Sequence, residues 1–212
     1  PLGAEFDFIA QDTTMGQPSW EKAESSMLKE CFELCCDKLG IPPRELDMIF
    51  SGDLLNQCIG SALALKNTGV RHFGLYGACS TMGEAMTLGA MAIDGGFAGR
   101  VCAVTGSHFC SSERQYRFPL EYGGQRPQSG QWTVTGAGAF LVVPGCSGDT
   151  CPLYPVGTAP LSYIRAGMVG IVLDRGVTDA NNMGAAMAPA AESTLCRFFE
   201  ASGTFPGDYD LI

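Results

Sequence analysis

The chain has 212 residues and a formal net charge of −9, with 46% hydrophobic and 17% charged residues. This composition supplies enough apolar side chains for a sizeable core and differs from that of a disordered chain. The negative charge argues against a nucleic-acid partner and against simple adhesion to anionic lipid, although docking onto a membrane protein stays open. Every uncharged apolar run is too short to span a bilayer, and no secretory signal is visible, so we expect neither a transmembrane segment nor a signal peptide.

The first predicted elements alternate between helix and strand. Residues 19–39 carry apolar side chains at three-to-four spacing, with Ser19 as a plausible N-cap and Gly40 as the stop. Short apolar runs that end in glycine or polar residues are typical of buried strands. In chain order we expect a helix at 19–39, a strand at 46–50, a helix at 57–67, a strand at 73–76, a helix at 80–94 and a strand at 101–105.

This β-α-β-α-β rhythm predicts an α/β fold in which helices cover a parallel sheet. A polar stretch at 107–135 has no clear period, and a loop of that length in a compact domain is usually functional or partly structured. Beyond it we expect a strand at 136–143, two further strands at 152–157 and 168–173, which we take as antiparallel, and a helix at 188–201.

Two segments of the chain are similar to each other. LGIPPRELDMI (39–49) aligns without gaps with SGTFPGDYDLI (202–212), and a predicted helix precedes each copy. Chance similarity is the alternative, because a helix followed by glycine, proline and a strand is a common arrangement. If the repeat is a duplication, residues 1–180 form a first half and residues 181–212 begin a second half, so that the chain stops inside that half's first strand.

The stretch LYGACSTMGEAM (75–86) places a cysteine at the corner between a strand and a helix. A thiol at the start of a helix lies near free backbone N–H groups and the positive end of the helix dipole, and both favour the thiolate. Three roles for Cys79 stay open: a catalytic nucleophile, a ligand contact or a buried thiol. The two histidines are His72, which we expect to pack in the structure, and His108, which follows a strand at the end where α/β sites are usually built.

Several motifs carry a resemblance to a known family. GDLLNQ (52–57), GACST (77–81), QWTVTGAGA (131–139) and NMGAAMAPAA (182–191), with RFPLEYG (117–123), resemble in this order the stage V sporulation protein AD family of endospore-forming bacteria. The strand–Cys–helix corner and the later Gly-Ala-Gly-Ala strand are also similar to the thiolase fold and the ketoacyl synthases. The resemblance implies a thiolase-like fold of duplicated α-β-α layers, here mostly the first half with the start of the second.

The same resemblance implies a function. It implies a non-catalytic protein that binds dipicolinic acid (pyridine-2,6-dicarboxylate), as the free acid or as its calcium chelate. Such a protein would work with membrane proteins of the same operon to load the acid into the developing spore and again in germination. It would lie peripherally at the spore inner membrane. Apart from calcium in a chelate, we expect no cofactor and no resident metal. A homodimer formed through a sheet edge is expected by analogy.

The resemblance implies that Asp53 and Cys79 lie at the ligand pocket. Because both carboxylates of the acid are ionised at neutral pH, arginines are the strongest partners, and residues 100–126 are locally basic with interleaved aromatic residues. Asp53 has three open roles: protonated by burial, holding an arginine or the Cys79 loop, or contacting a cation. The candidate ligand-binding residues are Asp53, Asn56, Cys79, Ser80, His108, Arg114 and Arg117.

The alternative function is a condensing enzyme, of the thiolase or ketoacyl-synthase type, that acts on acyl-CoA or acyl-carrier protein. Cys79 would be its nucleophile, and a histidine from the second half would handle the proton. Condensing enzymes often carry Asp where Thr135 stands, so we interpret that position as a partial loss of the enzymatic pattern.

Overall fold

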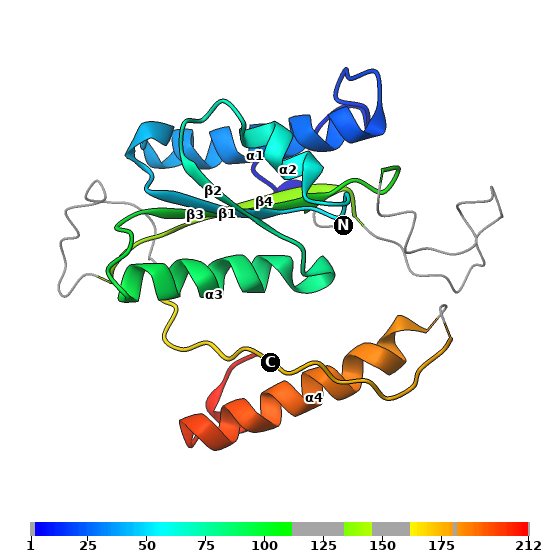
Figure 1. Ribbon diagram of the computed structural model, residues 1–212, viewed down its shortest axis with the longest axis vertical. Helices are drawn as coiled ribbons and strands as arrows, with labels where there is room; N and C mark the ends of the chain where they lie inside the picture. The colour runs from blue at the N-terminus through cyan, green and yellow to red at the C-terminus, as the bar shows by residue number, and fades with distance from the viewer. Residues whose placement is uncertain (1–2, 112–133, 146–161, 180–181, 212) are drawn as a thin grey trace.

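The computed structural model describes residues 3–111, 134–145, 162–179 and 182–211. A single four-stranded sheet has the order β2-β1-β3-β4 (Figure 1). β1 pairs in parallel with β2 and with β3, and β4 runs antiparallel to β3. The predicted α/β class is therefore confirmed, with a mixed sheet. The strands are β1 (Met48–Gly52), β2 (Arg71–Leu75), β3 (Val101–Ser107) and β4 (Gly136–Val142).

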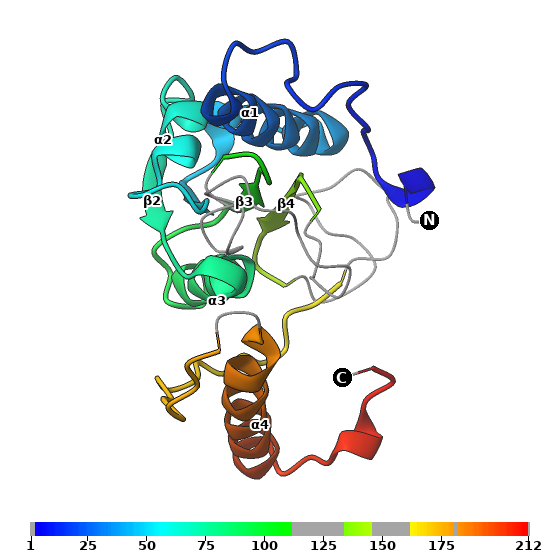
Figure 2. The same cartoon turned by 90° about the vertical axis from the view of Figure 1, so that its right-hand side faces the viewer.

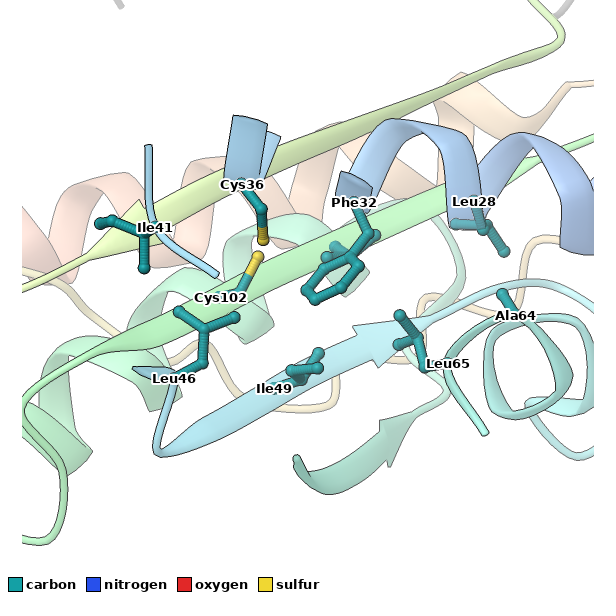
Figure 3. Close-up of a cluster of buried hydrophobic side chains, with 10 residues drawn as sticks. Leu28, Phe32, Cys36, Ile41, Leu46, Ile49, Ala64, Leu65 and Cys102 are labelled. Carbon is teal, nitrogen blue, oxygen red and sulfur yellow. The ribbon is translucent and has the colours of Figure 1, made fainter. Parts of the chain in front are cut away.

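Helices cover both faces of the sheet. α1 (Trp20–Leu39) and α2 (Ile59–Leu65) lie on one face and α3 (Thr81–Asp94) on the other (Figure 1). Side chains of successive strand residues point to opposite faces, so β3 contributes to two cores. Cys102 and Val104 join the core beneath α1 and α2 (Figure 3), whereas Val101 and Ala103 join the core above α3.

The ends of α1 follow the predicted capping chemistry. Ser19 Oγ accepts a hydrogen bond from Lys22 N at 3.3 Å, and Gly40 ends the helix with φ +65°. Glycine adopts this left-handed conformation without a Cβ penalty, and its N–H bonds back to the last turn of the helix. These local signals explain why the predicted and observed bounds of this helix agree to within one residue.

The other predicted bounds differ from the observed ones by a few residues. The strand predicted at 46–50 begins at Met48, because Leu46 is buried but follows a 3-10 turn at Pro43–Glu45 and lies outside the ladder. The helix predicted at 188–201 is α4 (Met183–Ser202), whose N-cap Asn182 accepts a hydrogen bond from Ala185 N at 3.1 Å. Pro189 lies inside this helix rather than near its start.

The strand predicted at 168–173 is wrong. Residues 162–179 have no secondary structure. A Cβ added to Gly167 would lie 3.8 Å from Thr87 Oγ1 of α3, and one added to Gly170 would lie 2.6 Å from Thr194 Oγ1 of α4. The segment therefore runs alongside two helices (Figure 2). The backbone groups of a helix are already hydrogen-bonded within it, so they cannot pair with a neighbouring strand. The strand predicted at 152–157 lies outside the described residues.

The two copies of the predicted repeat have the same local structure. α1 ends at Gly40 with φ +65° and α4 ends at Gly203 with φ +66°, and a 3-10 turn follows each helix, at Pro43–Glu45 and at Pro206–Asp208. The division into halves at residue 180 stays a prediction. In the part of the chain that the structure describes, no helix is both long and apolar enough to cross a bilayer.

Candidate functional site

The connections that leave β1 and β2 meet at the carboxyl ends of these parallel strands, which we call the sheet edge. The last residues of the two strands, Gly52 and Leu75, are paired in the ladder. A Cβ added to Gly52 would lie 2.3 Å from the Leu75 carbonyl oxygen and 2.4 Å from Thr81 Cγ2, so the end of β1 packs directly against the start of α3. The structure thus brings Asp53 and Asn56, which follow β1, to the same sheet edge as Cys79 and Ser80, which follow β2.

The chain turns sharply between β2 and α3, at an elbow that we define as residues 77–81. Ala78 has φ +50°, a left-handed conformation that is costly for a residue with a Cβ. Two hydroxyls stabilise the turn: Ser80 Oγ donates to the Gly77 carbonyl at 2.7 Å, and Thr81 Oγ1 donates to the Ala78 carbonyl at 2.8 Å. Thr81 Oγ1 also accepts from Gly77 N at 3.2 Å. The result is that Cys79 and Ser80 are exposed at the beginning of α3.

Two opposing charges act at the elbow. The positive end of the 14-residue helix α3 favours a bound carboxylate there. Glu84, one turn into the helix, opposes this effect: a Cβ added to Gly77 would lie 2.6 Å from Glu84 Oε2, so the carboxylate lies over the elbow. The sequence interpretation missed Glu84, although Thr81-Met82-Gly83-Glu84 has the T-x-x-E spacing that marks a helix start.

Asp53 lies at the sheet edge, but its carboxylate faces α2. The side chain is 2% exposed. Oδ1 accepts from Leu55 N at 2.8 Å in the β1–α2 connection, and Oδ2 accepts from Ser61 N at 2.6 Å in the first turn of α2. These contacts differ from the arginine or Cys79-loop contact that the sequence left open. Asp53 therefore positions α2, whereas Asn56 in the same connection is exposed.

His108 lies in a buried cluster between α1 and the end of β3. The ring is 1% exposed and packs against Trp20 with centroids 5.2 Å apart. Nδ1 accepts from Cys110 N at 3.1 Å, so the proton is on Nε2, which donates to the Thr13 carbonyl at 2.6 Å. With both nitrogens engaged inside the protein, the ring is not presented to a ligand at the sheet edge, contrary to the sequence-based expectation.

Glu24 of α1 holds the turn that follows β3. The carboxylate is fully buried, and its Oε2 accepts from His108 N at 3.2 Å and from the Ser111 hydroxyl. Thr135, just before β4, accepts from Phe109 N at 3.1 Å through Oγ1, so it closes the same turn from the other side. The predicted arginines, Arg114 and Arg117, follow this turn and lie outside the described residues.

His72 has the structural role that the sequence indicates. It lies on β2, and its Nε2 is 2.6 Å from Ser51 Oγ on β1. Burial lowers the pKa of this imidazole, while the negative charge of Asp53 partly opposes the shift. His72 is therefore neutral at physiological pH and links the two strands beneath α2.

Metal ligands do not gather at this edge. Among the described ranges of the chain, no three His, Cys, Asp or Glu side chains are arranged to hold a metal ion. A cavity of about 400 Å³ lies elsewhere, between the 162–179 segment and α4, and its lining contains no predicted site residue. The cavity is lined by Met168, Val169, Arg197, Glu200 and Ala201.

A family model decides what kind of protein presents this elbow. The model of Stage V sporulation protein AD (SpoVAD) matches residues 1–212. The chain belongs to this family. Stage V sporulation protein AD of Bacillus subtilis (strain 168) is 37% identical over 212 residues, which are 100% of this chain and 59% of that protein. As a member of the SpoVAD family, the chain is a sporulation protein that spans 59% of the length of this curated relative.

Solved structures with a similar fold include condensing enzymes. The 3-oxoacyl-[acyl-carrier-protein] synthase III of Aquifex aeolicus VF5 is 22% identical, and the match covers 57% of this chain and 38% of that one, with a TM-score of 0.45. The priming β-ketosynthase of the R1128 polyketide pathway is 20% identical over 57% of this chain and 36% of that one, with a TM-score of 0.44.

Proposed function

We propose that this SpoVAD family member binds dipicolinate, free or as its calcium chelate, for uptake into the developing spore and release in germination. The observation that carries the proposal is the elbow between β2 and α3 in a chain of this family. It presents the exposed Cys79 and Ser80 at the start of a 14-residue helix, at the sheet edge where β1 also ends. Ligands of open α/β sheets bind at the carboxyl ends of the strands.

The chemistry of the elbow suits one end of a dicarboxylate. Backbone N–H groups at the start of α3 are donors, and the helix dipole favours negative charge. Glu84 disfavours a bare dianion at the same place and therefore favours either the calcium chelate or a counter-charge from elsewhere. In the proposal, Arg114 and Arg117 supply that counter-charge.

The protein is proposed to bind rather than to catalyse. Nucleophilic catalysis by Cys79 requires a base within hydrogen-bond reach. His72 bonds to Ser51 and His108 bonds to Thr13 and Cys110, so neither histidine of this chain is directed at the thiol, and the base of the condensing-enzyme alternative would have to come from the second half. The condensing-enzyme alternative has one observation in its favour, the exposure of Cys79 at a strained elbow, because a nucleophile must be accessible at such a corner.

Association with the spore inner membrane is proposed to occur through membrane proteins of the same operon. The negative net charge of the chain supports protein docking over direct adhesion to anionic lipid. A homodimer is proposed through β2, which is an edge strand of the sheet and exposes Phe73. Substituting Phe73 with Glu should dissociate such a dimer in sedimentation velocity, whereas an unchanged sedimentation coefficient would rule out this edge.

Calorimetric titration of the full-length protein with dipicolinate, with and without calcium, tests the binding proposal. We expect saturable binding that Cys79→Phe abolishes by filling the elbow, while Cys79→Ser retains it because the hydroxyl is nearly isosteric. Thermal unfolding of both variants serves as the folding control. An absence of heat and of any dipicolinate-dependent shift in Tm for the wild-type protein would end the proposal.

Incubation with acyl-CoA, followed by intact mass measurement, tests the enzymatic alternative. A covalent acyl group on Cys79 that is missing from Cys79→Ser would support a condensing enzyme. Binding of dipicolinate by Cys79→Ser, together with the absence of such an adduct in the wild type, supports a binding protein.

A further inference from the structure

Tyr76 lies between the two connections that meet at the sheet edge. It follows Leu75, the last residue of β2, and directly precedes the elbow. Its hydroxyl donates a hydrogen bond at 3.3 Å to the carbonyl of Leu54, in the connection that leaves β1. Because Gly52 and Leu75 are paired in the ladder, a side chain that reaches from Tyr76 to Leu54 crosses the ends of both strands.

The ring is held in this position although half of the residue is open to solvent. Tyr76 is 49% exposed, and most of the surface of a tyrosine is ring surface. The bond to Leu54 holds the far end of the side chain. Cys58 Sγ donates to the Leu75 carbonyl at 3.0 Å, so the β1–α2 connection also holds the backbone just before Tyr76. A ring that is already ordered loses little conformational freedom when a ligand covers it.

Donors for carboxylates lie on both sides of the ring. Asn56, two residues after Leu54, is exposed in the β1–α2 connection, and its amide can donate. On the other side, the start of α3 offers backbone N–H groups just beyond the elbow. A flat ligand with two carboxylates could therefore lie with its ring on Tyr76 and its carboxylates toward these donors.

We propose that Tyr76 makes the sheet edge selective for an aromatic dicarboxylate, because its ring stacks on the ring of the ligand. The inference rests on the proposed function, since it assigns a further contact in the same site. Offset stacking of two aromatic rings is favourable beyond the area that it buries. Donors to the carboxylates alone would bind a saturated ring with the same two carboxylates equally well, so the preference for an aromatic ring must come from a ring such as that of Tyr76.

Calorimetric titration of the full-length protein with two ligands tests the proposal, in the calcium condition under which the wild type binds dipicolinate. The second ligand is cis-cyclohexane-1,3-dicarboxylate, which keeps two carboxylates on a six-membered ring but is not flat. Tyr76→Leu should weaken the binding of dipicolinate roughly 2–13-fold more than that of the saturated ligand. Tyr76→Phe keeps the ring and should keep the preference. Phe97→Leu is the matched control, because Phe97 is 75% exposed beyond the far end of α3.

A second variant tests the contact without removing the ring. In Tyr76→Trp, the added indole should stack on the ligand, so dipicolinate should quench the fluorescence of this variant more than that of the wild type. The saturated ligand should not produce the additional quenching. Thermal unfolding of all variants serves as the folding control.

The outcomes separate this inference from the proposed function. If the wild type binds dipicolinate and Tyr76→Leu keeps the same preference between the two ligands, the inference is overturned while the proposed function stands. Equal losses for both ligands would also overturn it, because Tyr76 would then only shape the elbow. A wild-type protein that does not bind dipicolinate would overturn both. A preference that is lost in Tyr76→Leu and kept in Tyr76→Phe supports the stacking contact.

Discussion

Removing the Asp53 carboxylate should lower the stability of the protein by weakening the attachment of α2. Any change in ligand binding should then result from this loss of stability. In Asp53→Ala, the backbone N–H groups of Leu55 and Ser61 lose the acceptors that now lie at 2.8 Å and 2.6 Å. A buried donor left without a partner costs about 1–3 kcal/mol, so the two together should cost ~2–6 kcal/mol. Asp53→Asn retains one acceptor and should cost ~1–3 kcal/mol. Since a domain has a total stability of about 5–15 kcal/mol, the alanine variant should be close to unfolding.

Urea unfolding monitored by circular dichroism measures both variants, and Asp37→Asn on the exposed face of α1 serves as the matched control. The control should stay within about 0.5 kcal/mol of the wild type. If Asp53→Asn folds, it should still bind dipicolinate, because the side chain at position 53 faces α2 and not the elbow. The reasoning is refuted if Asp53→Ala unfolds like the wild type, or if Asp53→Asn keeps full stability yet loses all binding.

Three further predictions concern the sheet edge. Gly52→Ala should cost at least ~1–3 kcal/mol in urea unfolding because the new Cβ meets the Leu75 carbonyl oxygen at 2.3 Å, whereas Gly83→Ala, which meets nothing within 4 Å, should be neutral or stabilising. Ala78→Gly should gain up to ~1 kcal/mol, since glycine adopts φ +50° without strain; a clear loss would show that the elbow is not strained. Because the pKa of His72 is lower in the folded protein than in the unfolded chain, the unfolded chain takes up a proton at a higher pH than the folded protein does. Stability should therefore fall as the pH drops below the unfolded-state pKa of about 6.5. His72→Gln should lose this dependence in Tm measurements made across pH.

The elements with strong local signals could be predicted from the sequence. The N-cap at Ser19 and the left-handed Gly40 fix the ends of α1 through contacts within one helical turn. Residues 168–173 show the opposite case: their apolar pattern is typical of a strand, but a strand forms only where another strand is available to pair with it. The neighbours of this segment are α3 and α4, which are not visible from its own sequence.

The candidate site could be predicted in its position but not in the direction of its side chains. Parallel strands that end together bring Asp53 and Cys79 to one edge, as the β-α-β rhythm indicates. Whether a carboxylate faces a ligand or a helix depends on backbone donors such as Ser61 N, whose position is set by the turn after β1. The orientation of His108 also could not be read from the sequence, because its partners are Thr13, Trp20 and Cys110.

The repeated segment distinguishes structure that forms from the local sequence from structure that depends on tertiary packing. The backbone bond from Ile41 N to the Cys36 carbonyl measures 3.0 Å, and its counterpart 163 positions later, from Thr204 N to the Phe199 carbonyl, measures 3.2 Å. Yet α1 buries five side chains against the sheet and α4 buries none. The helix, its glycine cap and the following 3-10 turn therefore form from local sequence alone, whereas burial requires a sheet beneath the helix. An unburied α4 is what the predicted duplication leads us to expect, because a second copy would need a sheet of its own to cover it, and the division into halves stays a prediction.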